Sequence, residues 1–171
     1  MLAVDESPFS QAAAQSVIGQ FRPKDTQVQV INVIEPVALY FSAEGLPHMS
    51  SDTPTVERER EKQAGELVQN VCAKLGKAGF RSSKIVLRGD PRAAILDRAG
   101  EWKPDLIVMG SHGLKGLNRL LMGSVSDAVA RHAGCSVQIV RVQAGTKEDE
   151  RRPGTSNWKG AKSKSPTSRR R

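Results

Sequence analysis

Apolar and polar positions follow two patterns along the chain, and the patterns alternate. Short runs of β-branched residues are typical of buried strands, and apolar side chains every three or four residues are typical of helices packed on a sheet. The short runs predict strands over residues 1–5, 28–34, 83–88, 105–109 and 137–142. The longer stretches predict helices over residues 8–21, 55–79, 91–99 and 124–132.

Residues at the predicted helix ends support this assignment. Ser7 and Pro8 combine a favourable N-cap with a proline at the first helical position. Gly79 suits the left-handed position that ends many helices. Residues 36–54 contain glycine, several prolines and scattered apolar side chains, which predicts a long irregular connection.

The alternation of strands and helices indicates an α/β fold. Crossovers between parallel strands are right-handed and place helices on both faces of the sheet. The sequence therefore predicts a three-layer, doubly wound, Rossmann-like architecture with a five-stranded parallel sheet. In such folds ligands bind at the carboxyl ends of the strands, where the strand order reverses.

The net charge of +8 is unevenly distributed along the 171 residues. Residues 1–142 hold 17 Lys and Arg against 15 Asp and Glu, whereas residues 143–171 hold 9 against 3 and no Val, Leu or Ile. Such a segment buries too little apolar surface to offset the entropy of ordering. We therefore expect one nearly neutral folded domain over residues 1–142 and a basic, disordered tail over residues 143–171.

Composition also bears on the cellular compartment. The apolar runs are too short for a membrane helix, and the N-terminus has acidic residues where a signal peptide needs a basic start. The two cysteines, Cys72 and Cys135, form no C-x-x-C pair, and Cys72 is expected in the core. These features predict a cytoplasmic protein with no membrane partner.

A glycine motif follows the strand predicted over residues 105–109. Gly110 and Gly113 lie where the chain must turn sharply, which favours positive φ, and Gly123-Ser124 begin a helix after nine intervening residues. The first N–H groups of a helix attract an anion, so the two arms suggest a pocket of phosphate size. The alternative is that the glycines only permit turns, and that Ser124 only caps the helix with Asp127 at the capping-box position.

The pattern Gly110-x-x-Gly113, nine residues, Gly123-Ser124 resembles the ATP-binding fingerprint of the universal stress protein family. Three further motifs agree with it, and they are Val4-Asp5-x-Ser7, Gly89-Asp90-Pro91 and Asp105-Leu-Ile-Val-Met-Gly110. The resemblance covers residues 1–142. It implies an adenine nucleotide alpha hydrolase-like domain that binds ATP, with Mg²⁺ as a candidate companion, and that dimerises through its last strand.

The resemblance also assigns the nucleotide contacts. The adenine and ribose would contact Asp5 and the backbone around Ala3, Val4 and Val33. The ribose and phosphates would be wrapped by Met109 to Gly113, including Gly110 and His112. The phosphates would be held by Gly123, Ser124, Val125 and Ser126. The chain departs from the family in two places, since its first strand has no lead-in residues and Ser136 replaces a usual proline.

Several other residues have two interpretations. Ser111 and His112 resemble a nucleophile and its base, but sequence neighbours seldom point at each other, so triad chemistry is not expected. Lys115 and Arg119 are candidate cations for a triphosphate or solvated loop charges. Asp90 is a candidate for Mg²⁺ or a ribose hydroxyl, but its place before Pro91 favours a helix cap. No His, Cys and Asp cluster has metal-ligand spacing, and no P-loop occurs.

These observations favour a cytoplasmic ATP-binding stress or regulatory protein rather than an enzyme. A slow ATPase is the first alternative, although no Glu or Gln beside the glycine loop is evidently placed to position water. The second alternative is a stress protein that does not bind ATP and whose tail contacts an acidic partner. Binding of nucleic acid by the tail is weakly supported, because Trp158 is its single aromatic residue.

Overall fold

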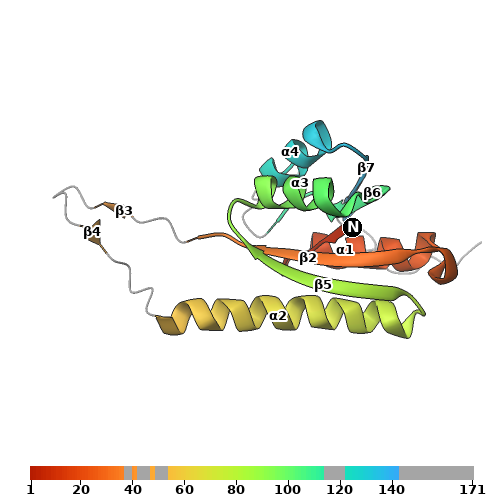
Figure 1. The fold of residues 1–171 in the computed structure, drawn as a ribbon, viewed down its shortest axis with the longest axis horizontal. Helices are drawn as coiled ribbons and strands as arrows, with labels where there is room; N and C mark the ends of the chain where they lie inside the picture. The colour runs from red at the N-terminus through yellow and green to blue at the C-terminus, as the bar shows by residue number, and fades with distance from the viewer. Residues whose placement is uncertain (37–39, 42–46, 49–53, 114–121, 143–171) are drawn as a thin grey trace, which may run out of the picture.

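Parallel strands form the central sheet of the computed structural model, which describes residues 1–36, 40–41, 47–48, 54–113 and 122–142 (Figure 1). The 5-stranded sheet has the order β5-β2-β1-β6-β7, and all its neighbouring strands are parallel. The strands are β1 (Leu2–Ala3), β2 (Gln27–Ile34), β5 (Arg81–Arg88), β6 (Leu106–Gly110) and β7 (Ser136–Val140). Because β1 lies between β2 and β6, the strand order reverses beside it.

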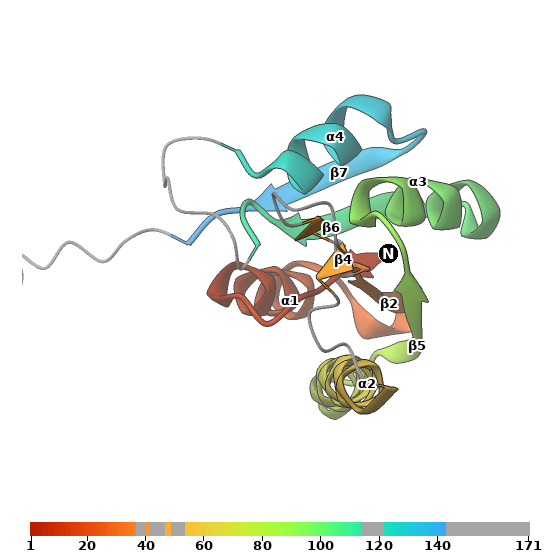
Figure 2. The same cartoon turned by 90° about the vertical axis from the view of Figure 1, so that its left-hand side faces the viewer.

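Helices cover both faces of this sheet (Figure 2). They are α1 (Pro8–Gln20), α2 (Pro54–Lys77), α3 (Pro91–Trp102) and α4 (Ser124–His132). On one face Val17 of α1 and Leu75 of α2 pack in one core cluster, and on the other Ile95 of α3 and Val129 of α4 pack in a second. The predicted three-layer, doubly wound α/β fold with a five-stranded parallel sheet is confirmed.

Strand β2 shows why a dense β-branched run marks a doubly covered strand. Val28 and Val30 belong to the cluster under α1 and α2, whereas Ile31 belongs to the cluster under α3 and α4. All three side chains are at most 4% exposed. Successive side chains of a strand point to opposite faces, so both faces of β2 are apolar because both are buried.

The predicted helix ends at Ser7 and Gly79 are confirmed. The Ser7 side chain accepts a hydrogen bond from the Ser10 N–H at 3.2 Å and caps α1. Gly79 has φ of 89°, and the Phe80 N–H donates to the Leu75 carbonyl at 3.0 Å. Leu75 and Phe80 are both buried, as expected where such a bond closes a helix end.

Several predicted boundaries were wrong. Strand β1 has two residues rather than five. Helix α3 continues beyond residue 99 to Trp102, and its C-cap Lys103 has φ of 50° and precedes Pro104. The connection predicted as irregular contains a short antiparallel pair, β3 (Tyr40–Phe41) with β4 (Pro47–His48). A short 3₁₀ helix, η1 (Pro23–Asp25), precedes β2. Pairing and capping of the backbone, which periodicity does not report, set these boundaries.

Three further expectations concern membrane-spanning helices, the cysteines and the basic tail. None of the described helices combines the length and apolar character that crossing a bilayer requires. Cys72 packs against the core cluster under α1 and α2 but is only partly buried, and both cysteines are free thiols. The predicted tail, residues 143–171, lies outside the described residues, as do Lys115 and Arg119.

Candidate functional site

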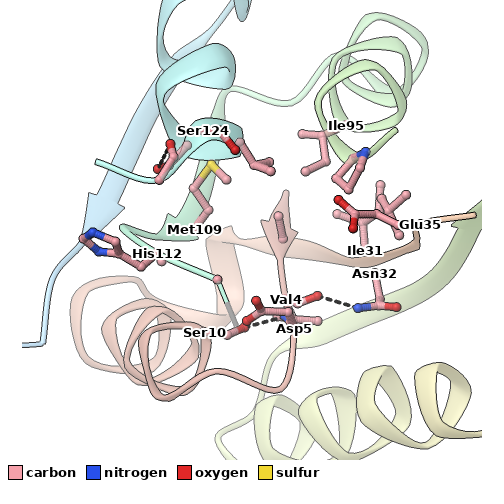
Figure 3. A pocket seen from close by; sticks show the side chains of 18 residues that line it. Val4, Asp5, Ser10, Ile31, Asn32, Glu35, Ile95, Met109, His112 and Ser124 are labelled. Atoms are coloured by element: carbon pink, nitrogen blue, oxygen red, sulfur yellow. Dashed lines mark hydrogen bonds between the residues drawn. The ribbon is translucent and has the colours of Figure 1, made fainter. Parts of the chain in front are cut away.

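A cavity of about 380 Å³ lies at the carboxyl ends of β1, β2 and β6, beside the point where the strand order reverses. Its walls also include the first turns of α1, α3 and α4 (Figure 3). This is the position at which doubly wound sheets bind ligands. All of the predicted contact residues line it, namely Ala3, Val4, Asp5, Val33, Met109, Gly110, His112, Gly113, Gly123, Ser124, Val125 and Ser126.

Gly110 and Gly113 are required for a different reason from the one predicted. Among the described glycines only Gly79 and Gly89 have positive φ. A Cβ on Gly110 would lie 2.7 Å from the Phe9 Cβ and 2.8 Å from the Phe9 backbone carbonyl carbon, closer than real Cβ atoms approach. A Cβ on Gly113 would lie 2.8 Å from Oδ2 of Asp5. These glycines therefore permit close approach of β6 and its loop to α1 and to Asp5.

Gly123 joins the second arm of the motif to the first. Its N–H donates to the Ser111 carbonyl at 2.9 Å, and a Cβ on Gly123 would lie 3.1 Å from the same oxygen. The hydroxyl of Ser126 lies 3.0 Å from that carbonyl oxygen and 2.9 Å from the carbonyl oxygen of Gly123, so it can donate to either. Hydrogen bonds thus hold the start of α4 against the loop that follows β6.

Helix α4 presents its N-terminus to the cavity. Its N-cap is Gly123, which supplies no side-chain hydrogen bond, and Ser124 is the first helical residue. The interpretation of Ser124 as the cap was therefore wrong, and Asp127 instead pairs with Arg131 at 2.9 Å. Because no side chain caps the helix, its first N–H groups and its dipole favour an anion here.

Ser111 and His112 do point at each other, contrary to the prediction. The Ser111 Oγ and the His112 Nδ1 are 3.1 Å apart, and the His112 ring packs on Phe9 with ring centroids 5.1 Å apart. The Ser111 side chain is 1% exposed, so its hydroxyl is not presented to a substrate. We interpret the pair as a hydrogen bond that stabilises the loop, not as a nucleophile and its base.

Asp90 is a helix cap, as the sequence favoured. Its carboxylate accepts hydrogen bonds from the Arg92 N–H at 2.8 Å and the Ala93 N–H at 3.3 Å. The hydrogen bond from the Arg92 side chain, at 2.6 Å, lowers the pKa of Asp90 well below its usual range. Asp90 does not line the cavity. Among the described residues no group of three or more His, Cys, Asp or Glu can hold a metal ion.

The sequence did not identify some of the cavity lining. The additional residues are Ser10, Ile31, Asn32, Glu35, Pro91 and Ile95. Asn32 was detectable as the polar residue near the end of a β-branched run, and its side-chain amide donates to the Val4 carbonyl at 2.7 Å. Ile31 was detectable because it lies two positions from Val33, on the same face of the strand. The contribution of α3 depends on how the helix crosses the sheet, which no local pattern reports.

Comparison with known proteins shows which family the chain belongs to. The model of the universal stress protein family matches residues 1–141. The chain belongs to that family. Universal stress protein Sll1388 of Synechocystis is 30% identical over 147 residues, which cover 82% of this chain and 96% of the relative. Universal stress protein YxiE of Bacillus subtilis is 28% identical over 143 residues, which cover 82% and 97%.

Solved universal stress proteins share the fold. The one from Lactobacillus plantarum has a TM-score of 0.68 and 22% identity, over 82% of this chain and 94% of that one. A family protein from Arabidopsis thaliana with AMP bound has a TM-score of 0.54 and 20% identity, over 84% and 90%. Two further structures of universal stress proteins contain cAMP and dAMP.

Proposed function

We propose that this universal stress protein binds ATP in the cavity described above and acts as a cytoplasmic, nucleotide-dependent regulator of the stress response. The observation that carries the proposal is the cradle made by Gly110, Gly113 and Gly123. At each of the three a Cβ would meet a neighbouring atom at 3.1 Å or less. The close packing that these glycines permit brings the two arms of the motif together beside the N-terminus of α4, which no side chain caps and whose N–H groups favour a phosphate.

The proposed pose follows the shape of the cavity. The adenine lies against apolar side chains such as Ile31 and Ile95, and the ribose lies beside Asp5. The phosphates accept hydrogen bonds from N–H groups at the start of α4, where each dipole interaction contributes about 0.3–1 kcal/mol. Family members solved with cAMP, AMP and dAMP support the binding of an adenine nucleotide. Mg²⁺ would be held chiefly by the phosphates, because it retains several waters and needs few carboxylates.

Binding is favoured over hydrolysis. Efficient hydrolysis requires a residue that positions water and a cation that stabilises charge at the γ-phosphate. The described residues at the glycine end of the cavity include no Lys, Arg, Glu or Gln. We therefore propose a regulatory protein in which bound ATP changes conformation or assembly, rather than an ATPase.

Calorimetric titration with ATP and with AMP tests this function directly. We expect saturable binding of ATP by the purified full chain, and adenine nucleotide in the mass spectrum of denatured protein. Absence of both binding and co-purified nucleotide would overturn the proposal. A steady release of phosphate that is lost with the cradle variants described below would instead favour the slow ATPase.

We propose that two copies pair through β7. This strand lies at the edge of the sheet and pairs only with β6 among the described strands, and Val142 just beyond it is 44% exposed. An apolar edge strand requires cover, and a two-fold axis would supply it with a second copy.

We expect a dimer in sedimentation equilibrium at micromolar concentration. Val142→Asp should weaken it about tenfold or more, since like charges would approach across the two-fold axis. The matched control is Val56→Asp, which changes another exposed valine, 36% exposed at the start of α2, and should leave the dimer intact. A monomer at every concentration would contradict the pairing.

We propose that residues 143–171 form a separate basic segment that binds polyanions weakly. A chain without these residues should lose binding to a generic DNA duplex and keep its ATP affinity. The affinity of the full chain for DNA should fall by about 0.7–0.9 log units per log unit of salt for each phosphate neutralised. Filter binding across a salt series measures this, and undiminished DNA binding by the shortened chain would place the basic surface in the domain.

A further inference from the structure

A hydrogen bond joins α3 to strand β2 below the cavity. The Nε of Arg98 on α3 donates to Oε1 of Gln29 on β2 at 2.8 Å. Gln29 is 6% exposed, and a second guanidinium nitrogen of Arg98 donates to Glu101 at 2.9 Å. Neither Gln29 nor Arg98 lines the cavity, so the pair lies outside the proposed nucleotide contacts.

The same two elements supply apolar walls of the adenine end. Ile31 follows Gln29 by two positions on β2, so their side chains share one face of the strand. Ile95 precedes Arg98 by three positions on α3, so these side chains share one face of the helix. Ile31 and Ile95 line the cavity and belong to one core cluster (Figure 3). The hydrogen bond and the apolar walls therefore belong to the same contact between α3 and β2.

Apolar packing alone holds α3 in place only weakly. Of the 12 residues of the helix, Ile95 and Ala99 are the buried ones, and alanine has little side chain to interlock with the strand. A buried glutamine side chain, in contrast, needs its hydrogen bond, because burial has removed its contact with water. A shift of α3 along β2 would separate Arg98 from Gln29. The position that keeps this bond also sets the distance between Ile31 and Ile95.

We propose that the hydrogen bond between Gln29 and Arg98 fixes α3 over β2 and thereby sets the width of the adenine end of the cavity. The two side chains are positioning residues, and they act through Ile31 and Ile95 without contacting the nucleotide. The inference rests on the proposed nucleotide binding and adds to it the means by which the pocket distinguishes a purine from a smaller base. A purine fills a slot of fixed width, whereas a slot that widens loses this fit.

Calorimetry with ATP and with CTP tests the role of the pair. We expect the unaltered full chain to bind ATP at least about tenfold more tightly than CTP, because the smaller base leaves part of the apolar slot unfilled. Gln29→Met removes the accepting oxygen with little change in volume, and it should lower this ratio by about threefold or more. Gln29→Glu keeps an oxygen that accepts from Arg98, and it should retain the ratio. A merely structural role would lower the urea midpoint of Gln29→Met and leave the ratio unchanged.

Gln69→Met is the matched control. Gln69 on α2 accepts a hydrogen bond from Lys84 on β5, so it too joins a helix to a strand through a cationic side chain. It lies outside the cavity, on a helix that covers the other face of the sheet, and we expect Gln69→Met to leave the ratio unchanged.

Three outcomes would overturn the role of the pair while ATP binding stands. They are a ratio near one in the unaltered chain, an unchanged ratio in Gln29→Met, and a ratio in Gln29→Glu that falls as far as in Gln29→Met. No ATP binding by the unaltered chain would overturn the proposed function and this inference together.

Discussion

Gly113→Val is expected to weaken ATP binding about tenfold or more while the domain stays folded, a loss of about 1.4 kcal/mol. The new Cβ would lie 2.8 Å from Oδ2 of Asp5, which is the end of a side chain and not backbone. The carboxylate therefore moves, together with the hydrogen bonds that it accepts from Ser7. The branched side chain also occupies the phosphate end of the cavity, so the substitution mainly weakens the binding of ATP.

Calorimetry with ATP measures the effect, and circular dichroism verifies the fold. The control is Gly134→Val, because a Cβ on Gly134 meets nothing within 4 Å and the residue lies outside the cavity. We expect the control to bind ATP as the unaltered chain does. Unchanged affinity in a folded Gly113→Val protein would remove the glycine loop from the binding site.

Gly110→Ala is expected to act on stability and to lower the free energy of unfolding by about 2–3 kcal/mol. The new methyl group would lie within 2.8 Å of both the Cβ and the backbone carbonyl carbon of Phe9. Helix α1 packs against β6 here, so relief requires the helix itself to move. Well-packed interiors do not absorb such a shift without cost.

Urea denaturation measures the change. Phe9→Ala should not rescue Gly110→Ala, because alanine retains the Cβ and the backbone carbon that cause the clash. Gly19→Ala is the control, since a Cβ there meets nothing within 4 Å and alanine favours the helix. A Gly110→Ala protein with the unaltered midpoint would show that β6 and α1 are less tightly packed than described.

The two glycines illustrate what sequence could and could not predict. Their spacing predicted the cavity correctly, because a strand end and a helix N-terminus meet at the carboxyl edge of a parallel sheet. The same spacing suggested positive φ, whereas the described backbone requires room for Phe9 and Asp5. A glycine in a sequence shows that a Cβ is absent. Which atom needs the space depends on contacts between residues distant in the chain.

The sheet and its helices were predictable because burial imposes a period on the sequence. Ile31 and Val30 point to opposite cores, and both had to be apolar. Side-chain hydrogen bonds such as that between Ser111 and His112 were not predictable, because a hydrogen bond between neighbours depends on rotamers and not on residue order. Glu35 was missed for a related reason, since its position after a strand does not show that it lines the cavity.

The central place of β1 has a consequence for biosynthesis. Leu2 pairs with Val30 on one side and Val108 on the other, and the Met1 amino group donates to the Leu106 carbonyl, 105 residues away. A nascent chain can pair β1 with β2, and β2 with β5, early, but the far side of β1 waits until β6 has left the ribosome. Such late, non-local pairing is slow and leaves an apolar edge open to other chains. We therefore expect the nascent domain to be most prone to aggregation in the interval before β6 closes the sheet.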